Sequence, residues 1–350
     1  MKDLDKQVQD QRMSCQQALE IYQTANLHEL AKSAHDLRMT KHPEPIVTYI
    51  VDRNINYSNI CISGCKFCAF YRSPGQNGGF VLSRGELFEK IQETISLGGV
   101  QILLQGSLNP DLSLYFYQDM LESIKNRFPK IHIHGFSPPE IVHLAHISKL
   151  TVHEILKRLI KAGLDSIPGG GAEILVDRVR QIVSPNKCSK DDWLEVMRTA
   201  HRFGLKTTAT MMFGHKETLK ERIEHLNALR QLQDQTGGFT AFIPWTFQPD
   251  NTALKARKLT SIEYLRFLSL ARIFLDNFDN LQASWVTMGP KIGQLALFFG
   301  ANDFGSTMLE ENVVAASGTC FRMGIEDIEN NIKQAGFLPK QRRMDYTLIQ

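Results

Sequence analysis

The chain has 350 residues, of which 43% are hydrophobic and 22% charged, an ordinary globular composition. Its formal net charge is only +3, and no run of basic residues indicates a nucleic-acid partner. The first residues lack the apolar core of a signal peptide, and no uncharged apolar stretch is long enough to span a bilayer. We therefore expect a cytoplasmic protein that neither binds nucleic acid nor inserts into a membrane.

Residues 1–43 are predicted to form an N-terminal helical extension. Ser14 and Gln17 have the spacing of a capping box, and apolar residues follow at helical intervals. From residue 44 to residue 350, β-rich runs alternate with amphipathic stretches. Strands are predicted at 48–51, 101–104, 131–134, 164–167, 207–212, 239–243, 283–287 and 295–299. Helices are predicted at 85–97, 113–128, 151–161, 190–203, 218–235 and 260–274.

Eight strands that alternate with helices favour an α/β fold, a parallel (βα)8 barrel of the TIM type, over an open sheet. Polar or glycine-rich segments follow most of these strands, at 105–107, 135–140, 168–173, 213–215, 244–251 and 300–305. Such barrels build their active sites from the loops at the carboxyl ends of the strands. The sequence therefore predicts an active site at that face, in one barrel domain over residues 44–350.

Three cysteines follow the first predicted strand. Cys61, Cys65 and Cys68 form a C-x3-C-x2-C run, and three thiolates on one loop can hold three irons of a 4Fe–4S cube while the fourth stays open. A structural zinc site would need a fourth ligand, and a disulfide framework suits short secreted chains. The other cysteines are solitary: Cys15, Cys188 and Cys320. The pattern favours a cluster held by the first three alone.

Other strand ends carry candidate ligands. Backbone carbonyls at Gly106 and Ser107 could accept hydrogen bonds from an ammonium group. Glu173 follows three glycines and could accept from a ribose diol or an ammonium, or else cap the next helix. His132 and His134 alternate on a strand, so both should point to the same side of the sheet. Without a third ligand they are better explained as core histidines than as a metal site, with His134 the better substrate contact.

The cysteine run resembles the signature of the radical S-adenosylmethionine (SAM) superfamily, in which SAM chelates the open iron. Longer segments narrow this resemblance to the dehypoxanthine futalosine cyclases of the futalosine route to menaquinone. These segments are 53–57, 65–72, 132–140, 208–215, 242–252 and 300–307. Ser107 departs from the family, which usually has a second glycine there. The loop at 74–79 is longer or more glycine-rich than usual; it is either a flexible cover over the site or a passive surface turn.

The resemblance implies a 4Fe–4S cluster and SAM as cofactors, an electron donor such as flavodoxin or ferredoxin, and dehypoxanthine futalosine as substrate. One electron from the cluster would cleave SAM to methionine and a 5′-deoxyadenosyl radical, which would take the hydrogen from the ribose 4′ carbon. That carbon would add to the substrate's own benzoate ring, and loss of an electron and a proton would give the cyclic product. The alternatives are aminofutalosine synthase, a deazaflavin (FO) synthase subunit, or a non-catalytic iron–sulfur electron carrier.

The resemblance and the strand-end positions together give two sets of expected contacts. The expected cofactor contacts are Phe67, Phe70, Gly106, Ser107, Ser137 and Glu173. The expected substrate contacts are His134, Gln248, Asp250, Asn251, Asp303 and Thr307. Trp245 and Phe247 could supply an aromatic wall for the benzoate. Met211 and Met212 are expected to pack in the core.

Overall fold

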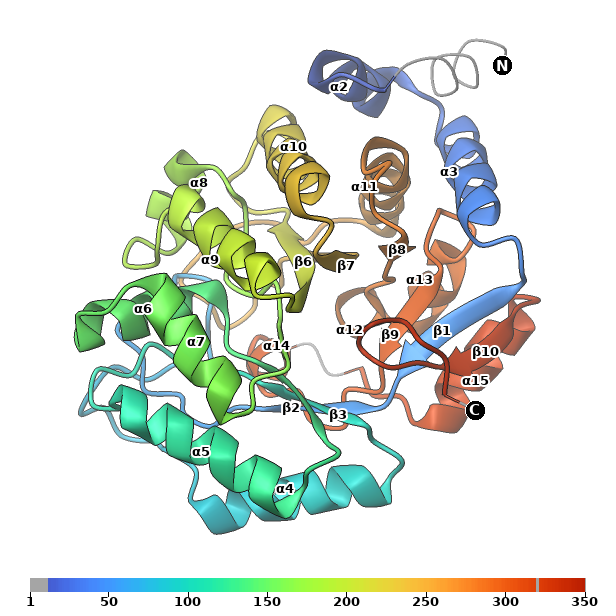
Figure 1. Ribbon diagram of the computed structural model, residues 1–350. Helices are drawn as coiled ribbons and strands as arrows, with labels where there is room; N and C mark the ends of the chain where they lie inside the picture. Colours follow the sequence, from blue (N-terminus) through green and yellow to red (C-terminus); the bar gives the residue numbers. More distant parts are fainter. Residues whose placement is uncertain (1–11, 319–320, 350) are drawn as a thin grey trace.

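The computed structural model describes residues 12–318 and 321–349, and their strands form a ring enclosed by helices (Figure 1). Cys320 lies outside the described residues. Within them, one parallel sheet runs in chain order: β2 (Asp52–Ile55), β3 (Gln101–Leu104), β4 (His132–Gly135), β5 (Ser166–Ile167), β6 (Lys206–Phe213), β7 (Phe239–Thr246) and β8 (Asn280–Leu281). Each strand pairs with the next one along the chain, as repeated βα units require.

A second sheet closes the ring. Its parallel strands are β10 (Leu338–Gln341), β1 (Ile46–Ile50) and β9 (Asp303–Ser306). β1 continues into β2 with only Val51 between them, and a bridge from Gln282 to Asp303 joins the end of β8 to β9. The N–H of Ala283 donates to the carbonyl of Asp303 over 2.9 Å at this junction. The strand formed by β1 and β2, together with β3 to β9, completes the eight positions of a TIM-type barrel, so the predicted fold is confirmed.

Helices cover the outside of the ring (Figure 1). The longer ones are α4 (Arg84–Ser96), α5 (Leu114–Arg127), α6 (Pro138–Ser148), α7 (Val152–Ala162), α9 (Lys190–Arg202), α10 (Leu219–Thr236) and α11 (Ser261–Phe274). Shorter ones are α8 (Asp177–Val183), α12 (Trp285–Met288), α13 (Pro290–Ala296), α14 (Val313–Ala316) and α15 (Ile325–Gln334). Many begin at a Ser or Thr with an acidic residue three positions on, and this capping box satisfies N–H groups that a helix start leaves unpaired.

Two helices precede the barrel, α2 (Cys15–Thr24) and α3 (Leu27–Lys41). The predicted capping box is present, since Ser14 and Gln17 exchange hydrogen bonds of 3.2 and 2.9 Å. α3 packs against α11, and α2 packs against α10 and α11. Both helices therefore lie on the outer surface of the helical layer (Figure 1).

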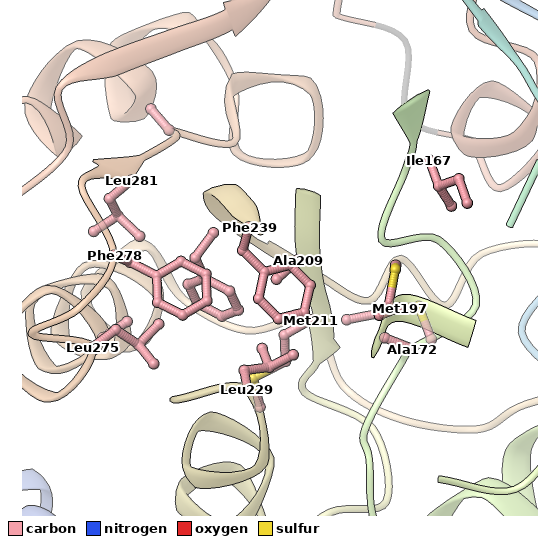
Figure 2. Close-up of a cluster of buried hydrophobic side chains, with 14 of the residues drawn as sticks. Ile167, Ala172, Met197, Ala209, Met211, Leu229, Phe239, Leu275, Phe278 and Leu281 are labelled. Carbon is pink, nitrogen blue, oxygen red and sulfur yellow. The ribbon is translucent and has the colours of Figure 1, made fainter. Parts of the chain in front are cut away.

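The apolar core fills the space between strands and helices. Figure 2 shows Met211 of β6 and Phe239 of β7 near Leu229 of α10 and Phe278, which follows α11. All four side chains are buried, and Met212 is buried as well, which confirms that both methionines pack in the core.

Two predicted strands are wrong. Residues 283–287 follow β8 and enter α12, and residues 295–299 span the end of α13 and the turn after it. The missing strand is β9 (Asp303–Ser306), which begins in the segment 300–305 that was expected to be a loop. A short apolar run does not distinguish a buried helix from a strand. β9 also contains Gly305 at φ +92°, which conceals it from a strand pattern.

Candidate active site

The interior of the ring holds a cavity of about 280 Å³. Alternate residues of several strands line this cavity, because every second side chain of a strand points to the same face of the sheet, here the inside of the ring. These residues are Ile50, Asp52 and Asn54; Gln101, Leu103 and Gln105; Thr208 and Thr210; and Ile243 and Trp245. His134, Gly170, Glu173, Thr287, Ser306, Glu311 and Arg342 also line the cavity. An aromatic and aliphatic wall is therefore combined with many hydrogen-bonding groups.

Two carboxylates lie in the wall of the cavity, those of Asp52 and Glu311. Asp52 accepts hydrogen bonds from Gln101 Nε2 at 2.9 Å and from the hydroxyl of Ser306. Glu311 accepts from Asn54 Nδ2 at 2.8 Å and from two backbone N–H groups at the start of α14. Burial raises the pKa of both carboxyl groups above its ordinary value. The alternation of Asp52 with Asn54 on a strand was the signal that could have identified this inner face.

Asp303, a predicted substrate contact, instead holds an arginine in place. Arg342 Nε donates to Asp303 Oδ2 over 2.5 Å, Nη2 donates to Oδ1 over 2.9 Å, and Thr48 also donates to Oδ2. Burial opposes the charge on Arg342, yet Asp303 raises the pKa of its guanidinium. Asp303 is fully buried and does not line the cavity, whereas Arg342 does.

The cysteine loop lies between β2 and α4, and its three thiols are free. The hydroxyl oxygen of Ser63 lies 3.0 Å from Cys61 Sγ and 3.2 Å from Cys65 Sγ. Burial raises the pKa of Cys65 to about 11 and also raises the pKa of Cys68. In the described part of the chain, no three His, Cys, Asp or Glu side chains converge on one point where a single metal ion would be held. Three free thiols on one short loop fit a cluster of several irons.

Glu173 connects the cavity to this loop. Its Oε1 accepts from Lys187 Nζ at 2.7 Å, and Lys187 Nζ lies 5.1 Å from the centre of the Phe67 ring. Burial opposes the charge on Lys187, but the neighbouring Cys65 and Glu173 raise the pKa of its ammonium group. Glu173 Oε2 is buried without a hydrogen-bond partner among the described residues, and Arg180 Nη1 lies 3.8 Å from it. A spare buried acceptor fits a ribose hydroxyl or an amino group.

The alternative interpretation of Glu173, as a helix cap, is wrong. The following helix α8 begins at Asp177, after Val176, and its N-cap position makes no side-chain hydrogen bond. The side chain of Glu173 lies on the cavity side instead, on a residue with φ +40°.

Gly106 is needed for packing. A Cβ atom there would lie 2.2 Å from Tyr57 Cζ. The Tyr57 hydroxyl and the Gly106 N–H both donate to Glu140 Oε1, at 2.6 and 3.0 Å, and the Ser137 hydroxyl donates to Glu140 Oε2 at 2.6 Å. Ser107 donates to a backbone carbonyl of the cysteine loop over 2.6 Å. Gly106, Ser107 and Ser137 were predicted to contact the cofactor, but none of them lines the cavity. Their hydrogen bonds instead connect the loops around the cysteines.

Of the predicted substrate contacts, only His134 lines the cavity. Gln248 is buried and donates to Thr246, and Thr307 is buried behind the wall. Asp250 pairs with Lys258 over 2.7 Å at the surface, and Asn251 donates to the carbonyl of Ala316 over 3.2 Å.

The predicted aromatic contacts also differ in position. Phe70, a predicted cofactor contact, packs edge-on against Phe80, with ring centres 6.1 Å apart. Trp245 lines the cavity as predicted, whereas Phe247 is buried outside it.

The chain is similar to known proteins over nearly its whole length. It is 46% identical over 348 residues to the cyclic dehypoxanthine futalosine synthase of Halalkalibacterium halodurans, covering 99% of this chain and 94% of that one. It is 43% identical to 5-amino-6-(D-ribitylamino)uracil–L-tyrosine 4-hydroxyphenyl transferase 1 of Methanosarcina barkeri, covering 91% and 86%. It is 38% identical to the aminodeoxyfutalosine synthase of Thermus thermophilus, covering 99% and 95%.

The fold and the family models agree with these relatives. The crystal structure of methylornithine synthase superposes with a TM-score of 0.74 at 17% identity over 96% of both chains, which shows a shared fold. No helix in the described residues is long and apolar enough to cross a membrane. Residues 55–229 match the radical SAM superfamily, whose cofactors are a 4Fe–4S cluster and SAM, and residues 236–350 match the CofH/MqnC C-terminal region. The chain therefore belongs to the radical SAM superfamily, in the group that carries this C-terminal region.

Proposed function

We propose that this protein cyclises dehypoxanthine futalosine to cyclic dehypoxanthinylfutalosine in menaquinone biosynthesis. The observation that carries the proposal is the 46% identity, over 99% of the chain, to a cyclic dehypoxanthine futalosine synthase. Three thiols on one loop, beside a cavity with an aromatic wall and many polar groups, support it. When bound, the cluster and SAM supply the 5′-deoxyadenosyl radical that abstracts the ribose 4′ hydrogen.

Around the cofactors, each side chain has a defined task. Cys61, Cys65 and Cys68 hold the cluster, and Glu173 Oε2 accepts a hydrogen bond from the ribose or the amino group of SAM. Lys187 holds Glu173 in position through their 2.7 Å bond and lies against Phe67. An electron donor such as flavodoxin or ferredoxin and a reducing cytoplasm complete the proposal, since free thiols persist in reducing compartments.

The cavity holds the substrate. Trp245 can pack against the benzoate ring, while Asn54, Gln105 and Thr210 offer partners for hydroxyl groups. The strand ring surrounds the reactants, so it can align the 4′ carbon with the benzoate and exclude water and stray hydrogen donors. Of the substrate contacts that the sequence predicted, His134 keeps this role, because it lines the cavity.

The test is an anaerobic assay of the reconstituted protein with SAM, a reductant and synthetic dehypoxanthine futalosine, read by mass spectrometry. We expect a product two hydrogens lighter than the substrate, formed together with 5′-deoxyadenosine. Parallel reactions supply the substrates of the aminodeoxyfutalosine synthase and the hydroxyphenyl transferase. Adenosyl carbon incorporated into product would support the former activity. Unchanged substrate from protein that carries an intact cluster and cleaves SAM would contradict the proposal.

Cluster assignment is tested separately. A variant with alanine at Cys61, Cys65 and Cys68 should lose the cluster, because each thiolate ligates one iron. Cys15→Ala and Cys188→Ala, which remove thiols elsewhere, should keep it. Iron analysis and Mössbauer spectra after anaerobic reconstitution measure this, and a full cluster in the triple variant would refute the assignment.

A further inference from the structure

A chain of three hydrogen-bonded side chains links β4 to β5. Nδ1 of His134 lies 2.7 Å from the hydroxyl oxygen of Ser166, and the same oxygen lies 2.7 Å from Nε2 of His132. The sheet register produces this contact, because His134 pairs with Ser166 and His132 precedes it by two residues on the same face. A hydroxyl can donate to one imidazole while it accepts from the other, so the three groups form one continuous path for a proton.

The two ends of this chain reach different cavities. His134 lines the central cavity, and no described residue hydrogen-bonds to its Nε2. His132 lines a second cavity of about 220 Å³ at the amino ends of β3 to β5. The rim of this second cavity includes the exposed residues Lys130 and Arg343, so it meets solvent. The chain thus runs from the substrate cavity to water at the opposite end of the barrel.

Of the carboxylates that line the central cavity, Glu173 is assigned to SAM in the proposed function, and Asp52 and Glu311 offer no comparable path. Both oxygens of Asp52 accept hydrogen bonds from Gln101 and Ser306. Both oxygens of Glu311 accept as well, one of them from the amide of Asn54. A proton taken up by either carboxylate would displace one of these bonds and remain buried.

We propose that His134, Ser166 and His132 form a relay that carries the proton lost by the benzoate ring from the central cavity to water. The inference rests on the proposed cyclisation. After the 4′ carbon has added to the ring, the ring C–H bond breaks heterolytically: the proton goes to Nε2 of His134, and the bonding electrons stay in the ring. The resulting radical anion gives one electron to an oxidised iron–sulfur acceptor and becomes the neutral aromatic product.

The proton then crosses the chain by successive exchange. His134 passes its Nδ1 proton to the Ser166 oxygen, the serine passes its own proton to Nε2 of His132, and Nδ1 of His132 releases a proton to water. His134 faces His132 and Arg342, while His132 faces Asp165, Lys125 and Asp345. Burial lowers the pKa of both imidazoles, so both are neutral at pH 7 and able to accept a proton. As the pH falls and either imidazole becomes protonated, the relay can no longer accept the proton from the substrate, so the rate of product formation falls.

Ser166→Ala breaks the chain and keeps both imidazoles. The matched control is Thr207→Val, which removes another buried hydroxyl that lies 2.7 Å from an imidazole, Nε2 of His201, but reaches neither cavity. The assay uses substrate deuterated at the ribose 4′ position. It measures deuterated 5′-deoxyadenosine and cyclic product separately, in H₂O and in D₂O.

We expect Ser166→Ala to form deuterated 5′-deoxyadenosine as the wild type does, but to form cyclic product about 100-fold more slowly. The wild type and Thr207→Val should form deuterated 5′-deoxyadenosine and cyclic product in the same ratio. Both should also show the same solvent isotope effect on the formation of cyclic product. Equal ratios of the two products in Ser166→Ala and wild type would overturn the relay. Absence of cyclic product from the wild type would instead overturn the proposed function.

A second measurement does not depend on turnover or on the variant folding. Nitrogen-15 NMR of histidine-labelled, metal-free wild-type protein reports the protonation of each ring. The relay requires both His132 and His134 to be neutral and hydrogen-bonded through the serine at pH 7. A charged ring at either position would overturn it.

Discussion

Among single residues, Glu173 combines a structural and a functional position. Its carboxylate pairs with the ammonium of Lys187 through one oxygen, and its other oxygen is buried without a hydrogen-bond partner among the described residues. A buried acceptor without a partner costs free energy, and such sites are retained where a ligand supplies the missing bond. In the proposed function, SAM donates to that oxygen and offsets this cost.

Replacement of Glu173 tests its structural role. Glu173→Ala leaves the Lys187 ammonium buried without its counter-charge, so the free energy of unfolding of the metal-free protein should fall by about 3–5 kcal/mol. The double variant with Lys187→Met should be less destabilised than Glu173→Ala alone, because the two residues interact directly. Urea unfolding measures both, and strictly additive losses would contradict the pairing.

Gly106 provides a test of packing at one position. In Gly106→Ala the new methyl would overlap the Tyr57 ring, so we expect a loss of about 1–3 kcal/mol in the free energy of unfolding. Gly85→Ala in α4 is the control, since its Cβ would meet nothing closer than 3.9 Å and alanine favours helix. Equal stability of the two variants would show that the loop relaxes around Tyr57.

Among the elements, the helix starts are specified locally. Thr260 caps α11, and Glu263 completes the capping box while it also pairs with Arg257. Because both partners of such a capping box lie within one turn, the helix start depends on neighbouring residues alone. The strands are harder to recognise from the sequence, because β5 and β8 are each two residues long and depend on neighbouring strands for pairing.

The capping box gives a pH-dependent prediction. The hydrogen bond from Arg257 lowers the pKa of Glu263 from 4.5 to about 2. A lowered folded-state pKa means that the stabilisation is complete above pH 4.5 and is lost as the pH falls toward 2. Glu263→Gln should therefore be less stable than wild type by about 0.2–1 kcal/mol at pH 7, and the difference should vanish near pH 2. Urea titrations across this range measure it, and a constant difference would contradict the assignment.

At the scale of the whole molecule, the N-terminal helices are tied to both ends of the barrel sequence. Arg38 of α3 is buried, donates to the carbonyl of Ile46 over 2.9 Å, and lies 4.5 Å from the ring centre of Phe337. α2 and α3 also cover α10 and α11. We infer that residues 12–43 stabilise the barrel and are not an independent appendage.

Deletion of residues 1–43 should consequently lower the thermal midpoint by roughly 5 °C or more, because it exposes apolar surface of α11. Arg12→Ala is the control: it removes only partly exposed ion pairs to Asp234 and Asp276 and should change stability by less than about 1 kcal/mol. Differential scanning calorimetry compares them. An unchanged midpoint in the deletion would show a separable extension.

The sequence by itself determined the features that neighbouring residues specify. The spacing of Cys61, Cys65 and Cys68 indicated the cluster, the alternation of βα units indicated the barrel, and His132 and His134 were correctly placed on one face. These signals are local because a loop spacing or a strand period is complete within a few residues.

Only the tertiary structure decided which polar groups face the cavity. The carboxylate of Asp303 pairs with Arg342, 39 residues further along the chain. β9 forms because it pairs with β1, which is its neighbour in the sheet but lies about 250 residues earlier in the sequence. Asp52 and Glu311 line the wall of the cavity instead. A buried polar side chain is defined by its hydrogen-bond partners, and in a closed barrel those partners come from strands far apart in sequence.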